Sequence, residues 1–117
     1  MFAELQVSKD GRFLYASNRD NSEPNLGRSS LGVFSIDIVS GVLTPVQFTS
    51  SLGEHPRHFD LFYEGSLLVV ANMNSDNIVS FMVNQSSGVL TPPPASSTGR
   101  ILETTKPTQL LRVPTGV

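Results

Sequence analysis

The sequence has no cysteine and no tryptophan. Without cysteine the chain forms neither a disulfide nor a thiolate zinc site, and this absence favours a cytoplasmic location. The first ten residues alternate apolar and polar side chains and include Glu4, a pattern unlike that of a secretory signal peptide. No stretch approaches the roughly 20 apolar residues that a transmembrane helix needs, so we expect no membrane association.

Charge is scarce as well. Charged residues make up 15% of the 117 residues, the formal net charge is −2, and no basic run occurs anywhere. The sequence therefore gives no reason to expect binding to nucleic acid or to an anionic surface. Hydrophobic residues make up 38%, a share typical of a folded globular protein rather than of a disordered one.

What the chain does contain is an internal repeat, the feature that most directly reveals an architecture. In the first part of each copy, equivalent residues lie 54 positions apart, as Leu5 and Phe59 do; further along they lie 47 apart, as Phe34 and Phe81 do. The segment Gly41-Val42-Leu43-Thr44-Pro45 recurs as Gly88-Val89-Leu90-Thr91-Pro92. The change of offset predicts a loop insertion in the first copy within residues 21–30, which are rich in Asn, Ser, Gly and Pro.

Each copy reads as four short strands between turn signals, the turns being Asp10-Gly11, Ser40-Gly41, Glu64-Gly65 and Ser87-Gly88. No window has helical periodicity. The strands expected in the first copy are Glu4–Ser8, Arg12–Ser17, Leu31–Asp37 and Leu43–Thr49. Those expected in the second are His58–Tyr63, Leu67–Asn72, Ile78–Val83 and a weaker fourth around Leu90 and Ser96–Ile101.

Four strands per unit of roughly 40–50 residues are typical of a β-propeller blade. We therefore predict an all-β partial β-propeller of about two four-stranded antiparallel blades plus one extra strand. Residues 1–53 form one blade, 54–105 a second, and 106–117 the terminal strand of a further blade. The alternative, an immunoglobulin-like sandwich, does not explain why the first four strands repeat as the next four.

Two blades leave two flat faces that neighbouring blades normally cover. We expect these faces to carry apolar residues such as Phe34, Val69 and Phe81. The repeated pairs Val42-Leu43 and Val89-Leu90 are expected to pack between blades. Exposed apolar patches of that size mark partner surfaces or aggregation sites. The expected partners are the remaining blades of a propeller or a second copy of the chain.

The motifs of the two copies resemble a known family. They are Gly53-Glu54-His55-Pro56-Arg57-His58-Phe59, Gly65-Ser66-Leu67-Leu68-Val69-Val70-Ala71-Asn72 and Ser75-Asp76-Asn77-Ile78-Val79 in the second copy, and the segment from Ala3 to Arg19 in the first. Together they resemble the lactonase family of seven-bladed propellers, which includes the propeller-type 6-phosphogluconolactonases and the carboxy-cis,cis-muconate cyclase. The resemblance implies that these are the last blades of the ring. It also implies a small anionic lactone as the substrate and no cofactor.

A lactonase needs a general base, a donor for the oxyanion and a cation for the substrate's acidic group. The segment His55-Pro56-Arg57-His58 gathers such residues at the end of an innermost strand. Arg57 is a catalytic and substrate-binding candidate because its planar guanidinium fits carboxylate or phosphate. His58 is a candidate proton carrier, and His55 a second substrate-binding candidate. For Arg57 and His58, a purely structural role, an ion pair or a backbone hydrogen bond, is the alternative.

Glu4 occupies the position equivalent to His58 and is the third catalytic candidate, expected to face the same channel. Pairing with an arginine of an adjacent blade is its alternative role. We predict no metal site: the two histidines lack a completing ligand set, and residues 72–77 lack the closing glutamate of a calcium loop. Those residues are expected to form a polar hairpin turn instead.

Two functions from different classes stay open. The chain is part of an enzyme that hydrolyses or forms a lactone of an anionic sugar acid or muconate, or it is a non-catalytic propeller remnant that serves as a scaffold or interaction module. In the lactonase family, the proposed catalytic cluster lies mainly in earlier blades. We therefore expect these 117 residues alone to be inactive.

Overall fold

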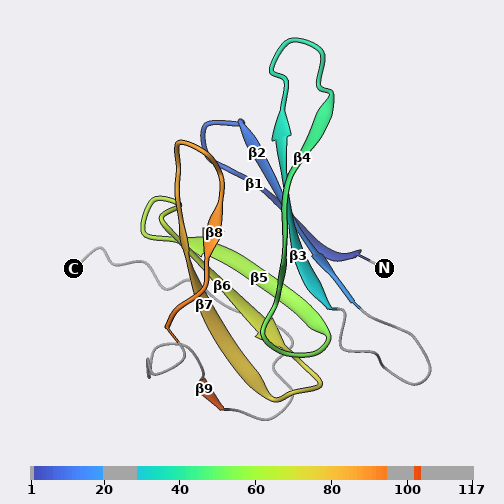
Figure 1. Cartoon of the computed structure of the whole chain (residues 1–117), viewed down its shortest axis with the longest axis vertical. Helices are drawn as coiled ribbons and strands as arrows, with labels where there is room; N and C mark the ends of the chain where they lie inside the picture. Colours follow the sequence, from blue (N-terminus) through green and yellow to red (C-terminus); the bar gives the residue numbers. More distant parts are fainter. Residues whose placement is uncertain (1, 20–28, 95–101, 104–117) are drawn as a thin grey trace.

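The computed structural model describes residues 2–19, 29–94 and 102–103. They form two antiparallel sheets, each built from strands that follow one another along the chain (Figure 1). The first sheet contains β1 (Phe2–Val7), β2 (Phe13–Asn18), β3 (Ser30–Ile36) and β4 (Leu43–Ser50), in that order. We call it blade 1.

The second sheet, blade 2, contains β5 (Pro56–Phe62), β6 (Leu67–Asn72), β7 (Asn77–Val83) and β8 (Leu90–Thr91), and the two-residue β9 (Leu102–Glu103) also pairs with β7. The predicted pair of four-stranded antiparallel blades is confirmed. Strand ends differ from the predicted ones by at most two residues, and those of β6 coincide with them. The predicted strand at Ser96–Ile101, the extra strand within 106–117 and nearly all of the insertion lie outside the described residues. No described segment is a helix long and apolar enough to cross a membrane.

The repeat extends to the hydrogen bonds of the hairpin turns. Asp37 Oδ1 accepts the N–H groups of Val39 and Ser40, and the equivalent Asn84 Oδ1 accepts those of Ser86 and Ser87. These donors hold the pKa of Asp37 below its usual value. In both turns a glycine with positive φ, 77° at Gly41 and 81° at Gly88, then donates to the carbonyl that opened the turn.

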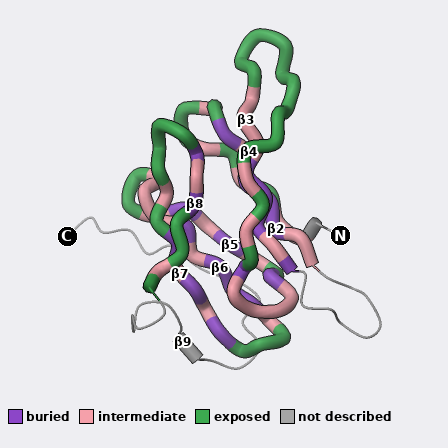
Figure 2. Tube along the Cα trace, viewed as in Figure 1, coloured by how far each residue is buried: buried purple, intermediate pink, exposed green. Residues whose placement is uncertain are grey.

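The core lies between the two blades rather than inside either one. One face of blade 1 packs against one face of blade 2. In terms of the repeat, these two faces are opposite sides of the sheet. Figure 2 shows the buried stretches of β2 lying toward those of blade 2. The buried cluster consists of Phe13, Tyr15, Leu31 and Val33 from blade 1 and of Phe59, Leu61, Leu68, Val70, Val79, Phe81 and Leu90 from blade 2.

Polar contacts fix the angle at which the blades meet. The Tyr15 hydroxyl donates to the Gly88 carbonyl at 3.1 Å, and the Gln47 amide exchanges two hydrogen bonds with the backbone of Leu90, at 2.9 and 2.8 Å. Asn72 and Asn77, both buried, donate to the carbonyls of Ser51 and Leu52 in the connection between the blades. Residues 73–76 form the predicted hairpin turn, and the two asparagines flanking it tie down the connection.

Two predictions about the blade faces are wrong. Phe81 was expected on an open face, but its side chain is fully buried in the cluster between the blades. The repeated Val-Leu pairs were expected to pack between blades; Leu90 does, at 1% exposure, whereas Leu43 is 47% exposed. Both errors have one cause: among the described residues, a face is buried only where the other blade packs against it. Phe34 and Val69 are half-buried.

Candidate functional site

The inner strands β1 and β5 begin with the same irregularity. Each has a β-bulge against its neighbour, between Phe2 and Glu4 in blade 1 and between Pro56 and His58 in blade 2. Bulges re-aim side chains near functional sites. In blade 2 the bulged residue is Arg57, whose side chain is exposed, while Pro56 before it is buried.

Glu4 and His58 meet across the two blades. The distance from Glu4 Oε2 to His58 Nε2 is 3.2 Å, and the two side chains are 27% and 17% exposed. The Glu4 backbone N–H donates to the hydroxyl of Ser17, which is fully buried and holds the start of β1. The structure therefore brings together two of the three catalytic candidates. Glu4 contacts the His58 imidazole, and its suggested pairing with an arginine of an adjacent blade stays a prediction.

His55 lies just before β5 with a φ of 62°, in the left-handed region that non-glycine residues seldom adopt. Its carbonyl accepts the Met73 N–H at 2.9 Å, which ties this backbone to the β6–β7 turn. Its ring nitrogen Nε2 is 2.9 Å from Arg19 Nη1. Because an arginine nitrogen only donates, Nε2 is the acceptor and the proton of the neutral ring lies on Nδ1.

The charge around His55 is positive. Burial, then the guanidinium groups of Arg19 and Arg57, lower the pKa of His55, so its ring is neutral at pH 7. The sequence prediction did not include Arg19 among the candidate site residues. Its place in the sequence could have identified it. Arg19 directly follows β2, just as Met73 directly follows β6, and this position places its side chain near the start of an inner strand.

Arg57 has no carboxylate partner within the described part of the chain. Its exposed guanidinium lies close enough to His55 to act on that ring's pKa. The start of β5 therefore carries an arginine on a bulge, a neutral histidine and a second arginine in contact with that histidine. This set can bind a carboxylate or phosphate group. No group of three or more possible metal ligands occurs among residues 2–19, 29–94 and 102–103.

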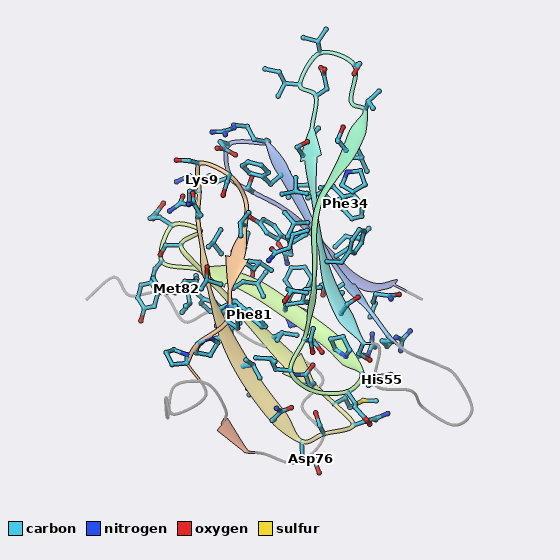
Figure 3. The ribbon with its side chains drawn as sticks, in the orientation of Figure 1. Lys9, Phe34, His55, Asp76, Phe81 and Met82 are labelled. Atoms are coloured by element: carbon cyan, nitrogen blue, oxygen red, sulfur yellow. The ribbon has the colours of Figure 1, made fainter. Side chains whose placement is uncertain are left out.

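A cavity of about 220 Å³ between the blades lies at the other end of the inner strands. It is lined by Tyr15, Phe13, Leu61 and residues of the two inner hairpin turns, and by none of the predicted site residues. Figure 3 shows Lys9, in one of those turns, at the upper left and His55 at the lower right, on opposite sides of the view. Burial and the nearby Asp10 carboxylate raise the pKa of Tyr15 to about 12, so its hydroxyl stays protonated and serves as a structural donor.

Comparison with known proteins identifies the family. Residues 1–100 match the family described as "Lactonase, 7-bladed beta-propeller". The chain belongs to this lactonase family of seven-bladed β-propellers. It is 41% identical over 88 residues to a 6-phosphogluconolactonase of Formosa agariphila, covering 75% of this chain and 24% of that protein. It is 34% identical over 87 residues to the 6-phosphogluconolactonase of Bacillus subtilis, covering 74% and 23%.

Solved structures agree with this assignment. A putative 6-phosphogluconolactonase of Bacteroides uniformis superposes with a TM-score of 0.76 at 28% identity, over 92% of this chain and 28% of that one. The periplasmic gluconolactonase of Pseudomonas aeruginosa gives 0.76 at 33% identity, over 92% and 27%. The chain thus spans about a quarter of the length of these relatives.

Proposed function

We propose that these two blades form part of a lactonase-type propeller that opens a lactone of an anionic sugar acid, of the 6-phosphogluconolactone kind. The observation that carries the proposal is the exposed Arg57 on the bulge of β5, beside His55 and Arg19. The relatives named above are 6-phosphogluconolactonases and a gluconolactonase, which favours lactone opening over muconate cyclisation. The cytoplasmic location stays a prediction.

Each side chain has a distinct role in this proposal. Arg57 binds the phosphate or carboxylate of the substrate, because its guanidinium is exposed and lacks a carboxylate partner within the described residues. Arg19 adds a second guanidinium beside His55, whose pKa both arginines lower. The Glu4–His58 pair positions the starts of β1 and β5 relative to each other, since each group is held by the other.

The chain on its own is proposed to bind the anion but not to catalyse. Arg57 supplies substrate binding, whereas the imidazole of His58 and the carboxylate of Glu4 are engaged with each other. Catalysis needs a base and an oxyanion donor aimed at one carbonyl group. In this proposal, those groups come from other blades of the ring.

Binding and turnover test the two halves of the proposal separately. We expect titration with 6-phosphogluconate, the open product, to shift the amide signals around Arg57 and His55, and Arg57→Gln to abolish those shifts. Arg12→Gln, an exposed arginine in the β1–β2 turn, is the matched control and should bind normally. Equal loss of the amide shifts in Arg57→Gln and Arg12→Gln would contradict an anion-binding site at Arg57. Hydrolysis of 6-phosphogluconolactone above the buffer rate, abolished by Arg57→Ala, would overturn the inactivity of the isolated chain.

A second function, a non-catalytic interaction module, is favoured by a different observation. One face of blade 1 exposes a row of apolar side chains, including Leu5 and Phe48. An apolar sheet face of this kind marks a binding surface.

A further inference from the structure

The cavity of about 220 Å³ between the blades lies where three hairpin turns meet, and we call it the turn cavity. These turns join β1 to β2, β5 to β6 and β7 to β8, and Figure 1 shows them gathered at one end of the molecule. Every lining residue belongs to one of these turns or to the strands beside them. Both walls of the cavity therefore lie within the described residues of two adjacent blades.

Hydrogen bonds between the turns hold these walls in place. The Arg12 guanidinium donates from the β1–β2 turn to the Ser86 carbonyl at 2.8 Å. The Lys9 ammonium donates from the same turn to Glu64 Oε2, in the β5–β6 turn, at 3.0 Å. The β1–β2 turn of blade 1 is thus tied to two turns of blade 2, and the turn cavity is enclosed by linked segments.

The floor of the turn cavity is apolar. It is formed by the side chains of Phe13, Tyr15, Leu61 and Val83. The Tyr15 hydroxyl already donates to a backbone carbonyl, so the floor favours an apolar group over water. An engineered apolar cavity of about 150 Å³ holds benzene, so by proportion the turn cavity has room for about nine non-hydrogen atoms.

The rim of the turn cavity carries two pairs of opposite charges. Asp10 lies 3.7 Å from the Arg12 guanidinium and accepts the Ser8 hydroxyl, which holds the pKa of Asp10 below its usual value. The hydrogen bond from Lys9 holds the pKa of Glu64 below its usual value in the same way. Both carboxyl groups are therefore ionised at neutral pH, and the pair of Lys9 and Glu64 spans the two blades.

The Lys9–Glu64 pair can give way to a ligand that carries both charges. Both side chains are 83% exposed, and an exposed pair of this kind contributes little to stability, so parting it costs little. A ligand with one charge would meet a like charge at Lys9 or at Glu64. A ligand with a carboxylate and an ammonium group offers each of them an opposite charge.

The turn that supplies Glu64 is strained, although the repeat does not require this. Tyr63 and Glu64 have φ values of 50° and 57° and are followed by Gly65 at 87°. In the equivalent β1–β2 turn, whose residues are all described, Gly11 alone has a positive φ, 76°. Strained non-glycine residues cluster at functional sites such as ligand clamps. This observation supports a binding role for the β5–β6 turn.

We propose that the turn cavity binds an α-amino acid with an aliphatic side chain. Lys9 binds the carboxylate, Glu64 binds the ammonium group, and the aliphatic side chain packs on the apolar floor. Leucine has as many non-hydrogen atoms as the volume accommodates. The inference is independent of the lactonase proposal, because the turn cavity shares no residue with the site at Arg57 and His55.

Calorimetric titration of the full chain with four probes tests which features of the ligand are recognised. The probes are L-leucine, glycine, 3-methylbutylamine and 4-methylpentanoate. Leucine should bind at least about tenfold more tightly than each of the others, because glycine lacks the apolar side chain and the amine and the acid each lack one charge. Leucine should also shift the amide signals of Gly65 and Gln85, which line the cavity.

Variants of the rim test the assigned contacts. Lys9→Met and Glu64→Gln should each weaken leucine binding at least about fivefold, and both replace exposed side chains. Lys9→Met should leave binding of 3-methylbutylamine undiminished, because it removes the like charge. The matched control is Asp76→Asn, which removes a carboxylate from the exposed β6–β7 turn, well away from Lys9 in Figure 3, and should bind leucine normally.

The other outcomes contradict the proposal. Absence of saturable leucine binding up to the solubility limit overturns it. If 3-methylbutylamine or 4-methylpentanoate binds as tightly as leucine, the cavity recognises a single charge and the assignment of an amino acid is wrong. If Asp76→Asn weakens leucine binding as much as Glu64→Gln does, the effect comes from the overall charge of the chain and not from this rim.

Discussion

Phe34 in blade 1 and Phe81 in blade 2 hold the same position of a repeated sheet, yet one is half-buried and the other fully buried. Leu43 and Leu90 differ in the same way, at 47% and 1% exposure. Their strands, turns and hydrogen bonds correspond. The difference is that blade 1 covers the face of blade 2, while no described residue of blade 2 covers the equivalent face of blade 1. In a propeller, position within the blade fixes a residue's side of the sheet, and the neighbouring blade fixes its burial.

Truncating the equivalent phenylalanines should give the largest contrast. Phe81→Ala removes a fully buried ring and should cost roughly 3–5 kcal/mol of unfolding free energy. Phe34→Ala removes a half-buried ring that packs edge-on against Phe48 and should cost about 1–2 kcal/mol. Urea unfolding at low protein concentration measures both. Equal losses would break the comparison.

The equivalent turn glycines, Gly41 and Gly88, test the same contrast between the two blades. Gly41→Ala and Gly88→Ala both force a Cβ onto a positive-φ residue, which costs roughly 1–2 kcal/mol. At Gly88 the added Cβ would also lie 2.6 Å from the Phe13 ring of the other blade, whereas space around Gly41 is open. We expect about 1–3 kcal/mol more loss at Gly88. Thermal unfolding of the two variants measures the difference, and its absence would mean that Phe13 does not pack on this turn.

The contact between Tyr15 and Gly88 can be tested by varying the pH. Its pKa is about 12 in the folded chain against 10.0 for an ordinary tyrosine, so the folded state holds the phenol proton more tightly than the unfolded state does. The resulting stability is complete below pH 10 and is lost as the pH rises from 10 to 12. Tyr15→Phe should cost about 1 kcal/mol at neutral pH, through the hydrogen bond to Gly88, and should remove this alkaline decline. Urea unfolding across that pH range is the measurement; a decline unchanged in the variant would assign it to another group.

The smallest effect should come from the exposed ion pair between the blades. Lys9 and Glu64 lie 3.0 Å apart, but both side chains are 83% exposed. Lys9→Met should therefore leave the urea midpoint almost unchanged, and the difference should be smaller still in high salt. A clear drop of the midpoint in the same urea assay would show that this end of the interface depends on charge rather than on apolar packing.

The repeat in the sequence was enough to predict the sheets, because strand period, glycine turns and register are local properties. Leu67–Asn72 was placed at its observed bounds, and the hairpin turns were found at their glycines. Burial was harder to predict, since it depends on which face meets the other blade. Phe81 and Leu67 lie on opposite sides of the same sheet. Because nothing in a single sheet shows which of its two sides meets the other blade, Phe81 was assigned to an open face.

The candidate site was predicted only in part, because its contacts also depend on how the two blades meet. The segment from His55 to His58 stood out by composition, and the equivalence of Glu4 and His58 placed both at the starts of inner strands. Their pairing required the angle between the blades, which Tyr15, Gln47 and the buried asparagines set. Arg19 was missed because its contact with His55 spans 36 positions of sequence and joins residues with no equivalence in the repeat.

Cysteine labelling of equivalent positions tests most directly the claim that the repeats pack as neighbouring blades with one face covered and the other open. The chain has no cysteine of its own, so Leu43→Cys and Leu90→Cys each introduce a single thiol at the same position of the two blades. At low protein concentration, the thiol at position 90 should react with an alkylating reagent at least about tenfold more slowly than the thiol at position 43, because it reacts only when the blades separate. Equal rates in folded protein would contradict the account.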